Sequence, residues 1–178
     1  KWPWAWRQGD PAAAAPPALA TRLRMELERL LEREPWPQAL DLLAQWQAMP
    51  LLDRQLQNDS RRTQRLRWSQ RLGLPLMPAL LLGAADPVVV AQRLQIPGKQ
   101  QQWLQQCVTF CDWLVDASPP LEAPPSMWSS ALEHQGCSPE VVALAVTLRP
   151  PQWKCLLRWW GRWRRIQAQQ TARDLIAE

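Results

Sequence analysis

Residues 19–43 read LATRLRMELERLLEREPWPQALDLL, and this stretch decides the fold class. Leucines recur in it at intervals of three and four, the spacing that places side chains on one buried face of a helix. Charged residues follow the same spacing on a second face, as in an exposed helix with an ion-pair ladder. Pro35 ends this helix, and Pro37 suits the first turn of the next. The leucines are Leu19, Leu23, Leu27, Leu30 and Leu31, and the charged residues are Arg22, Glu26, Arg29 and Arg33.

Similar punctuation marks helices along the rest of the chain. Asp86-Pro87 and Ser138-Pro139 each place a capping side chain before a proline at the first helical position. Residues 98–116 are expected to form one long helix, and the helix after Pro37 has an apolar set that includes Trp46. No segment shows the sustained alternation that strands need. We therefore predict an all-α fold, an irregular array of about ten short helices.

Composition divides the chain into four regions. Residues 1–18 are rich in Pro, Ala and Trp and are typical of a lead-in or linker. Residues 19–117 form a first helical region, residues 118–126 a Pro-rich linker, and residues 127–178 a second helical region.

The net charge of +5 permits a nucleic-acid or anionic-surface partner. No apolar stretch is long enough to span a bilayer, because the best candidate, residues 72–85, is short and is broken by Pro75 and Pro78. With no signal sequence either, the expected location is the cytoplasm, and no membrane partner is expected.

Charge is arranged in blocks along the sequence. Residues 54–99 hold eight basic residues against two acids, and residues 108–148 hold five acids and no Lys or Arg. Residues 149–173 then hold seven basic residues and no acid. A solvated surface usually mixes signs, so the two basic blocks are the candidates for contact with an anionic partner.

The segment PQWKCLLRWWGRWRR, residues 151–165, carries two stripes if it is one helix. The stripe of Leu156, Trp159, Trp160 and Trp163 is expected to be core, because helical spacing explains it fully. The basic stripe suits the rising phosphates of a nucleic-acid backbone, and a membrane surface is the competing partner. The basic stripe consists of Lys154, Arg158, Arg162 and Arg165.

The segment SRRTQRLRWSQR, residues 60–71, is the second basic run. Its arginines spread around a helix rather than sharing one face, so it is either an RNA contact or a solubilising surface helix. The arginines are Arg61, Arg62, Arg65, Arg67 and Arg71, and the RNA contacts expected among them are Arg61, Arg65, Arg67 and Arg71.

Residues with catalytic or metal-binding chemistry are sparse. A zinc site from Cys107, Cys111, His134 and Cys137 is conceivable, but the spacing fits no common zinc pattern and buried thiols are the simpler interpretation. There is no Ser-His-Asp set, no Gly-rich phosphate loop and no Asp-x-Asp pair for two-metal chemistry. We expect the chain by itself to be non-catalytic, with no metal and no cofactor of its own.

Four segments together resemble bacterial tRNA nucleotidyltransferases, the family of CCA-adding enzymes and poly(A) polymerases. TRLRMELERLL at 21–31 resembles a helix of that family, and PQALDLLAQWQAMPLL at 37–52 follows it as there, although Ala48-Met49-Pro50 replaces the usual Gly-Leu-Leu type of turn. LPLMPALLLGAADPVVVAQRLQIP at 74–97 is similar to the body region of cyanobacterial members, and TARDLIAE at 171–178 to the C-terminal segment.

The resemblance implies that the chain is the neck, body and tail part of such an enzyme, cut inside its last helix. Thr171 and Asp174 form a capping box that announces that helix. A catalytic head upstream would hold Mg²⁺, ATP and CTP, and the partners of this part would be that head and tRNA. The helical regions of the family grip the acceptor and T arms of tRNA during 3′-end maturation and repair, and Arg22 and Arg24 match its neck helix. Structural ion pairing is the other role open to these two arginines.

A different class of function also fits the sequence. The chain could be a helical module that docks a protein partner with exposed tryptophans as anchors and has no RNA role.

Overall fold

The computed structural model describes residues 17–166, and this part of the chain contains ten α-helices, two 3₁₀ helices and no strand. The predicted all-α fold is therefore confirmed. The helices are α1 (Pro17–Arg33), α2 (Trp36–Gln45), η2 (Met49–Leu51), α3 (Arg54–Gln57), α4 (Arg62–Arg71), α5 (Leu76–Leu81), α6 (Pro87–Arg93), α7 (Gly98–Asp116), α8 (Pro125–His134), α9 (Pro139–Leu148), α10 (Trp153–Gly161) and η3 (Trp163–Arg165).

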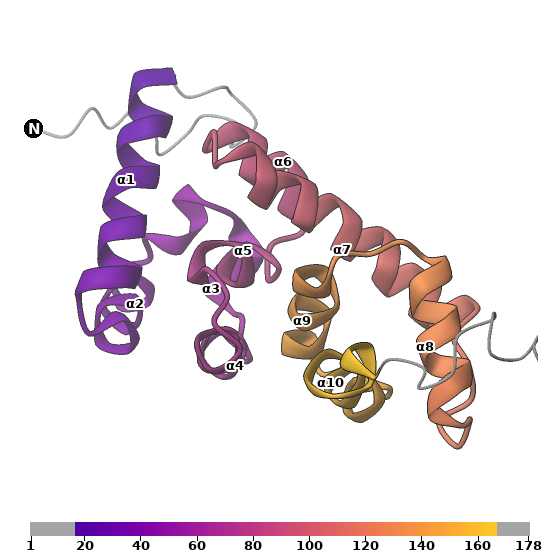
Figure 1. The fold of residues 1–178 in the computed structure, drawn as a ribbon. Helices are drawn as coiled ribbons and strands as arrows, with labels where there is room; N and C mark the ends of the chain where they lie inside the picture. The colour runs from indigo at the N-terminus through magenta and orange to yellow at the C-terminus, as the bar shows by residue number, and fades with distance from the viewer. Residues whose placement is uncertain (1–16, 167–178) are drawn as a thin grey trace, which may run out of the picture.

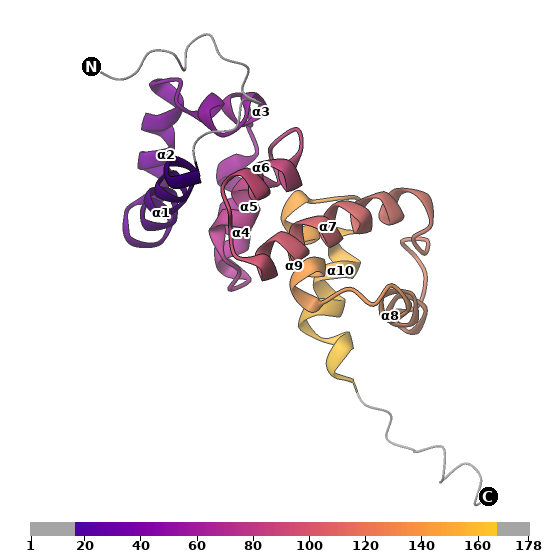
Figure 2. The same cartoon turned by 90° about the horizontal axis from the view of Figure 1, so that it is seen from above.

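The helices form an elongated, irregular array. Figure 1 shows α1 and α2 at one end and the long helix α7 running from α6 towards α8. Helices α9 and α10 lie below α7 in that view. Figure 2 shows the same order from above, with α1 and α2 at one end, α8 and α10 at the other, and α4 and α5 between them.

Helix α9 is the centre of the array. Every side chain from Val141 to Thr147 is buried, because α9 packs against α4, α7 and α10. A helix that is apolar on all sides must be surrounded in this way. One continuous hydrophobic core runs from Leu27 to Trp159, so the regions on either side of linker 118–126 share it.

The predicted caps begin their helices as expected. The Asp86 carboxylate accepts hydrogen bonds from the amides of Val88 and Val89 at 3.1 and 3.0 Å, which starts α6. The Ser138 hydroxyl accepts from the Val141 amide at 3.4 Å and starts α9. The Asp86 and Ser138 side chains thus satisfy amides that would otherwise have no partner in the first turn. Helix α7 also has the predicted bounds, residues 98–116.

The Pro-rich linker is held against the helices. Helix α8 already begins at Pro125, inside the predicted linker. The Trp128 ring is fully buried, and its indole N–H donates to the Pro120 carbonyl at 3.2 Å. The Gln152 amide donates to the Leu114 carbonyl at 2.9 Å and so ties the start of α10 to the end of α7.

Two apolar predictions are wrong in detail. Leu27 and Leu31 of α1 are buried as predicted, but Leu19 lies near the start of α1 and is 43% exposed. Trp46 is 71% exposed, because α2 ends at Gln45 and the chain turns away from the core there. The capping box at Thr171 and Asp174 lies outside the described residues. Within residues 17–166, no helix has the length and apolar character needed to cross a membrane.

Candidate nucleic-acid interface

The arginines of the first basic run are divided between the core and the surface. Arg65 is 4% exposed: its guanidinium forms an ion pair with Asp59 and donates to the carbonyls of Ala79 and Leu80. Arg62 is also buried, and its guanidinium forms an ion pair with the Asp41 carboxylate at 3.5 Å. These two arginines therefore fix α4 against its neighbours.

This placement corrects one predicted RNA contact. Arg65 cannot present its guanidinium to a phosphate, because its side chain is buried and its donors are used within the protein. Arg67 and Arg71 of α4, and Arg61 just before its first turn, are exposed. The prediction that the run spreads around the helix is confirmed, and the exposed three remain candidates.

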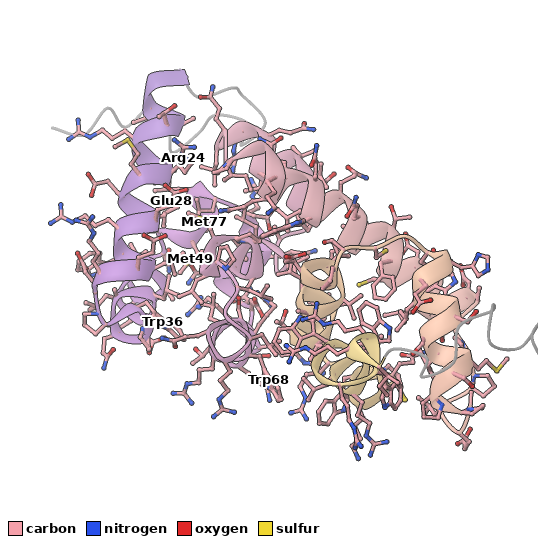
Figure 3. All side chains as sticks on the ribbon, in the orientation of Figure 1. Arg24, Glu28, Trp36, Met49, Trp68 and Met77 are labelled. Carbon is pink, nitrogen blue, oxygen red and sulfur yellow. The ribbon has the colours of Figure 1, made fainter. Side chains whose placement is uncertain are left out.

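The exposed side of α4 meets the start of α10 through two tryptophans. The Trp68 ring of α4 and the Trp153 ring of α10 pack edge to face, with centroids 6.0 Å apart and an interplanar angle of 64°. Figure 3 shows Trp68 on the side of α4 that faces α9 and α10. This geometry is favourable for the ring quadrupoles, by about 0.5–1.5 kcal/mol beyond the area buried.

Three cations lie over these two rings. The Arg149 guanidinium is 4.6 Å from the Trp153 centroid and 5.9 Å from the Trp68 centroid. Arg71 lies 5.9 Å from Trp68, and the Lys154 ammonium lies 5.8 Å from Trp153. We call these five residues the Trp–cation patch. A ring below each cation restricts its position without neutralising its charge.

Arg149 joins the two halves of the patch. It follows α9 as its C-cap with a left-handed backbone (φ 54°), which turns the chain away from α9 and towards α10. Sequence reasoning did not select Arg149, Trp68 or Trp153 as site residues. The Arg149-Pro150-Pro151 break after an apolar helix was visible, but no sequence pattern places it beside α4.

The predicted C-terminal stripes are only partly formed. Leu156 and Trp159 are buried, and Trp160 and Trp163 pack against the core, so the interpretation of the Trp stripe as core is confirmed. The basic stripe does not run along one helix, because α10 ends at Gly161. Lys154 and Arg158 are exposed one turn apart on α10, whereas Arg162 follows its end and Arg165 lies in η3.

The two predicted neck residues have different surroundings. The Arg24 guanidinium donates to the Gln95 carbonyl at 2.7 Å, and the Thr21 hydroxyl donates to the Gln95 side chain at 2.9 Å. Arg24 thus ties α1 to the turn between α6 and α7. Arg22 is exposed.

The patch carries an excess of positive charge. Within residues 17–166, none of its three cations, Arg71, Arg149 and Lys154, forms an ion pair with a carboxylate. Exposed Arg67 and Arg158 lie on the same two helices and add to this charge. Such a surface attracts polyanions and gains free energy when they release their counterions.

The cysteines form a separate feature on α7 and beyond. Cys107 donates a hydrogen bond to the Cys111 sulfur, which lowers the pKa of Cys111 against the effect of its burial. The same bond, together with burial, raises the pKa of Cys107, and burial raises the pKa of Cys137 and Cys155. Among the residues that the structure describes, no three His, Cys, Asp or Glu side chains converge to hold a metal ion.

Comparisons with protein-family models, with curated proteins and with solved structures found no match to this chain.

Proposed function

We propose that this chain is an RNA-binding helical region that contacts the RNA backbone through the Trp–cation patch. One observation carries the proposal: segments far apart in sequence bring Arg71, Arg149 and Lys154 together over two packed tryptophans, and within residues 17–166 none of these three cations forms an ion pair with a carboxylate. Double-stranded RNA hides its base edges in a deep, narrow groove, so it is recognised mainly by shape and backbone contacts. Cations that are held in place and are not paired with a carboxylate suit contacts with the RNA backbone.

A membrane surface fits α10 less well than RNA does. A helix that lies on a bilayer inserts its apolar face among the lipids. In α10 that face is already covered, because Leu156 is fully buried and Trp159 is 5% exposed in the protein core. The cations remain outside, where they suit a polyanion in solution.

The resemblance in sequence makes the RNA more specific. We propose that the parent protein is a cytoplasmic tRNA nucleotidyltransferase that adds CCA or A to RNA 3′ ends, and that this region grips the acceptor and T arms of tRNA. In this proposal Mg²⁺, ATP and CTP belong to an upstream catalytic head, as the resemblance implies, and this region acts by holding tRNA.

The test is a binding titration of the chain with folded tRNA and with an unstructured RNA of equal length, each at two salt concentrations. We expect tighter binding to folded tRNA and a steep loss of affinity with salt, with a slope of roughly 0.7–0.9 for each phosphate contact. Equal and weak binding to both RNAs would contradict the proposal and leave only a generic basic surface.

Paired variants locate the contact. The double variant Arg71→Gln with Arg149→Gln should bind folded tRNA roughly tenfold more weakly, since it loses two exposed ionic contacts worth about 0.7 kcal/mol each, and about 1.4 kcal/mol is a factor of ten. Arg29→Gln with Arg33→Gln removes the same charge from the exposed side of α1 and should change affinity little. Equal losses in both variants would show that net charge, and not the patch, determines binding.

The second candidate function, a protein-interaction module, has one observation in its favour. Trp46 is 71% exposed at the end of α2, and Leu42 and Leu51 near it are 45% and 49% exposed. Exposed tryptophans are frequent anchors of protein interfaces. In this function, Trp46→Ala would abolish partner capture and Arg71→Gln with Arg149→Gln would not; the RNA proposal requires the reverse for tRNA.

A further inference from the structure

A second polar site lies at the opposite end of α4 from the Trp–cation patch. There, the segment from α3 to the start of α4 and the turn after α5 line an open pocket of about 490 Å³. Arg54 and Arg61 are among its lining residues, and both are exposed. Three neutral side chains that can donate hydrogen bonds also line it: Gln55, Asn58 and Ser60.

The carboxylate in the pocket does not cancel these cations. Asp59 also lines the pocket, but one of its oxygens pairs with the buried Arg65 guanidinium. The other oxygen accepts a hydrogen bond from the Arg61 amide at 3.0 Å. Arg65 and Asp59 therefore neutralise each other, and the charges of Arg54 and Arg61 remain in excess.

Gly83 keeps that ion pair in place at the pocket. A Cβ atom on Gly83 would lie 2.3 Å from an Arg65 terminal nitrogen and 2.3 Å from an Asp59 carboxylate oxygen. Only a residue without a side chain leaves room for the pair here. The Arg65 guanidinium also donates to the Ala79 and Leu80 carbonyls, so the partner that holds Asp59 is itself fixed to the protein interior.

The lining selects an anion with several oxygens. Two guanidinium forks suit a tetrahedral oxyanion, because a phosphate group presents its oxygens in more than one plane. A carboxylate offers two oxygens in a single plane and would leave much of this donor set without a partner. We propose that this pocket binds a phosphate group through Arg54 and Arg61, with Gln55, Asn58 and Ser60 as further donors.

Two sources could supply the phosphate group. Arg61 and Arg71 are ten residues apart, which corresponds to about 15 Å along α4. A backbone phosphate of RNA bound at the Trp–cation patch is the first source, and this source rests on the proposed function. A free small molecule with a phosphate group is the second, and it does not.

The deciding experiment is a titration of the full chain with inorganic phosphate, followed by amide NMR, with chloride at equal ionic strength as the reference. We expect saturable shifts confined to residues 54–61 and 83. They should disappear in Arg54→Gln with Arg61→Gln and persist in Arg29→Gln with Arg33→Gln, with unchanged far-UV circular dichroism in both. Shifts that do not saturate, or that chloride reproduces, would overturn the proposal.

The source of the phosphate is then read from tRNA binding by the Arg54→Gln, Arg61→Gln variant. A salt slope reduced by roughly 0.7–0.9 per lost contact identifies an RNA phosphate. An unchanged salt slope of tRNA binding, together with phosphate binding by the unsubstituted chain, identifies a free small molecule as the source. If the unsubstituted chain binds phosphate saturably but does not bind tRNA, the proposed function is wrong and the phosphate site remains supported.

Discussion

Trp68 and Trp153 meet edge to face at 6.0 Å, although one belongs to α4 and the other to α10. This contact brings the two basic blocks of the sequence onto one surface. Arg149 lies over both rings, so a single side chain connects the α4 and α10 contributions. The charge pattern of the sequence thus becomes a surface only through the packing of α9 between these helices.

Replacing Arg149 with glycine should separate binding from stability. Glycine removes the strain of a left-handed backbone at φ 54°, a gain of about 1–2 kcal/mol, and loses two exposed cation–π contacts worth about 0.5–1 kcal/mol each. The free energy of unfolding in urea should therefore change by less than about 1 kcal/mol, while the affinity for tRNA falls.

A matched control for this variant exists at the end of α2. Gln47 has a similar backbone (φ 52°) and carries no charge. Gln47→Gly should stabilise the protein by about 1 kcal/mol and leave tRNA affinity unchanged. If Arg149→Gly instead lost several kcal/mol of stability and kept its affinity, Arg149 would be a structural residue only.

Two arginines of α4 that are two positions apart should behave in opposite ways. Arg65→Ala leaves Asp59 without its buried partner and should cost about 3–5 kcal/mol in the free energy of unfolding. Arg67→Ala changes an exposed side chain and should cost less than about 0.5 kcal/mol. Urea denaturation of the two variants measures both; similar losses would mean that α4 packs differently from this structure.

Much of the helical architecture was predictable because its signals are local. Caps and prolines act within one helical turn, so Asp86 and Ser138 mark the starts of α6 and α9, and α7 has its predicted bounds. The core role of Trp159 also follows from helical spacing alone. Such features depend on neighbours three or four residues away, which the sequence displays directly.

The candidate site was less predictable because it depends on contacts between distant segments. Nothing near Arg65 in the sequence indicates that Ala79 and Leu80 will offer their carbonyls, so its burial could not be inferred. The basic stripe of residues 154–165 assumed a continuous helix, but Gly161 ends α10 and redirects the chain. Arg149 belongs to the candidate site only because the end of α9 places its guanidinium over the Trp68 ring.

Two glycines should respond oppositely to alanine. Gly83→Ala places a methyl group against the ion pair of Arg65 and Asp59, and overpacking of this kind costs about 1–3 kcal/mol. Gly98 begins α7 and has open space around its Cβ position, so Gly98→Ala should be neutral or stabilising by up to about 1 kcal/mol. Thermal unfolding of both variants compares them directly. A neutral Gly83→Ala would show that the ion pair relaxes freely, and would weaken the account of the phosphate pocket.

Cys111 should be the first thiol to react as pH rises. Its pKa lies below the ordinary value because Cys107 donates a hydrogen bond to its sulfur, whereas burial raises the pKa of Cys137 and Cys155. The thiolate is the nucleophile and its fraction grows as pH passes through the pKa. Iodoacetamide labelling followed by peptide mass analysis should therefore modify Cys111 at a lower pH than the other cysteines.

The variant Cys107→Ala tests the cause of this low pKa. It removes the hydrogen-bond donor, so the pH at which half of Cys111 is labelled should rise. Cys155→Ala is the control that should leave this pH unchanged. A Cys111 profile that is the same in all three proteins would mean that the Cys107 hydrogen bond does not set its reactivity.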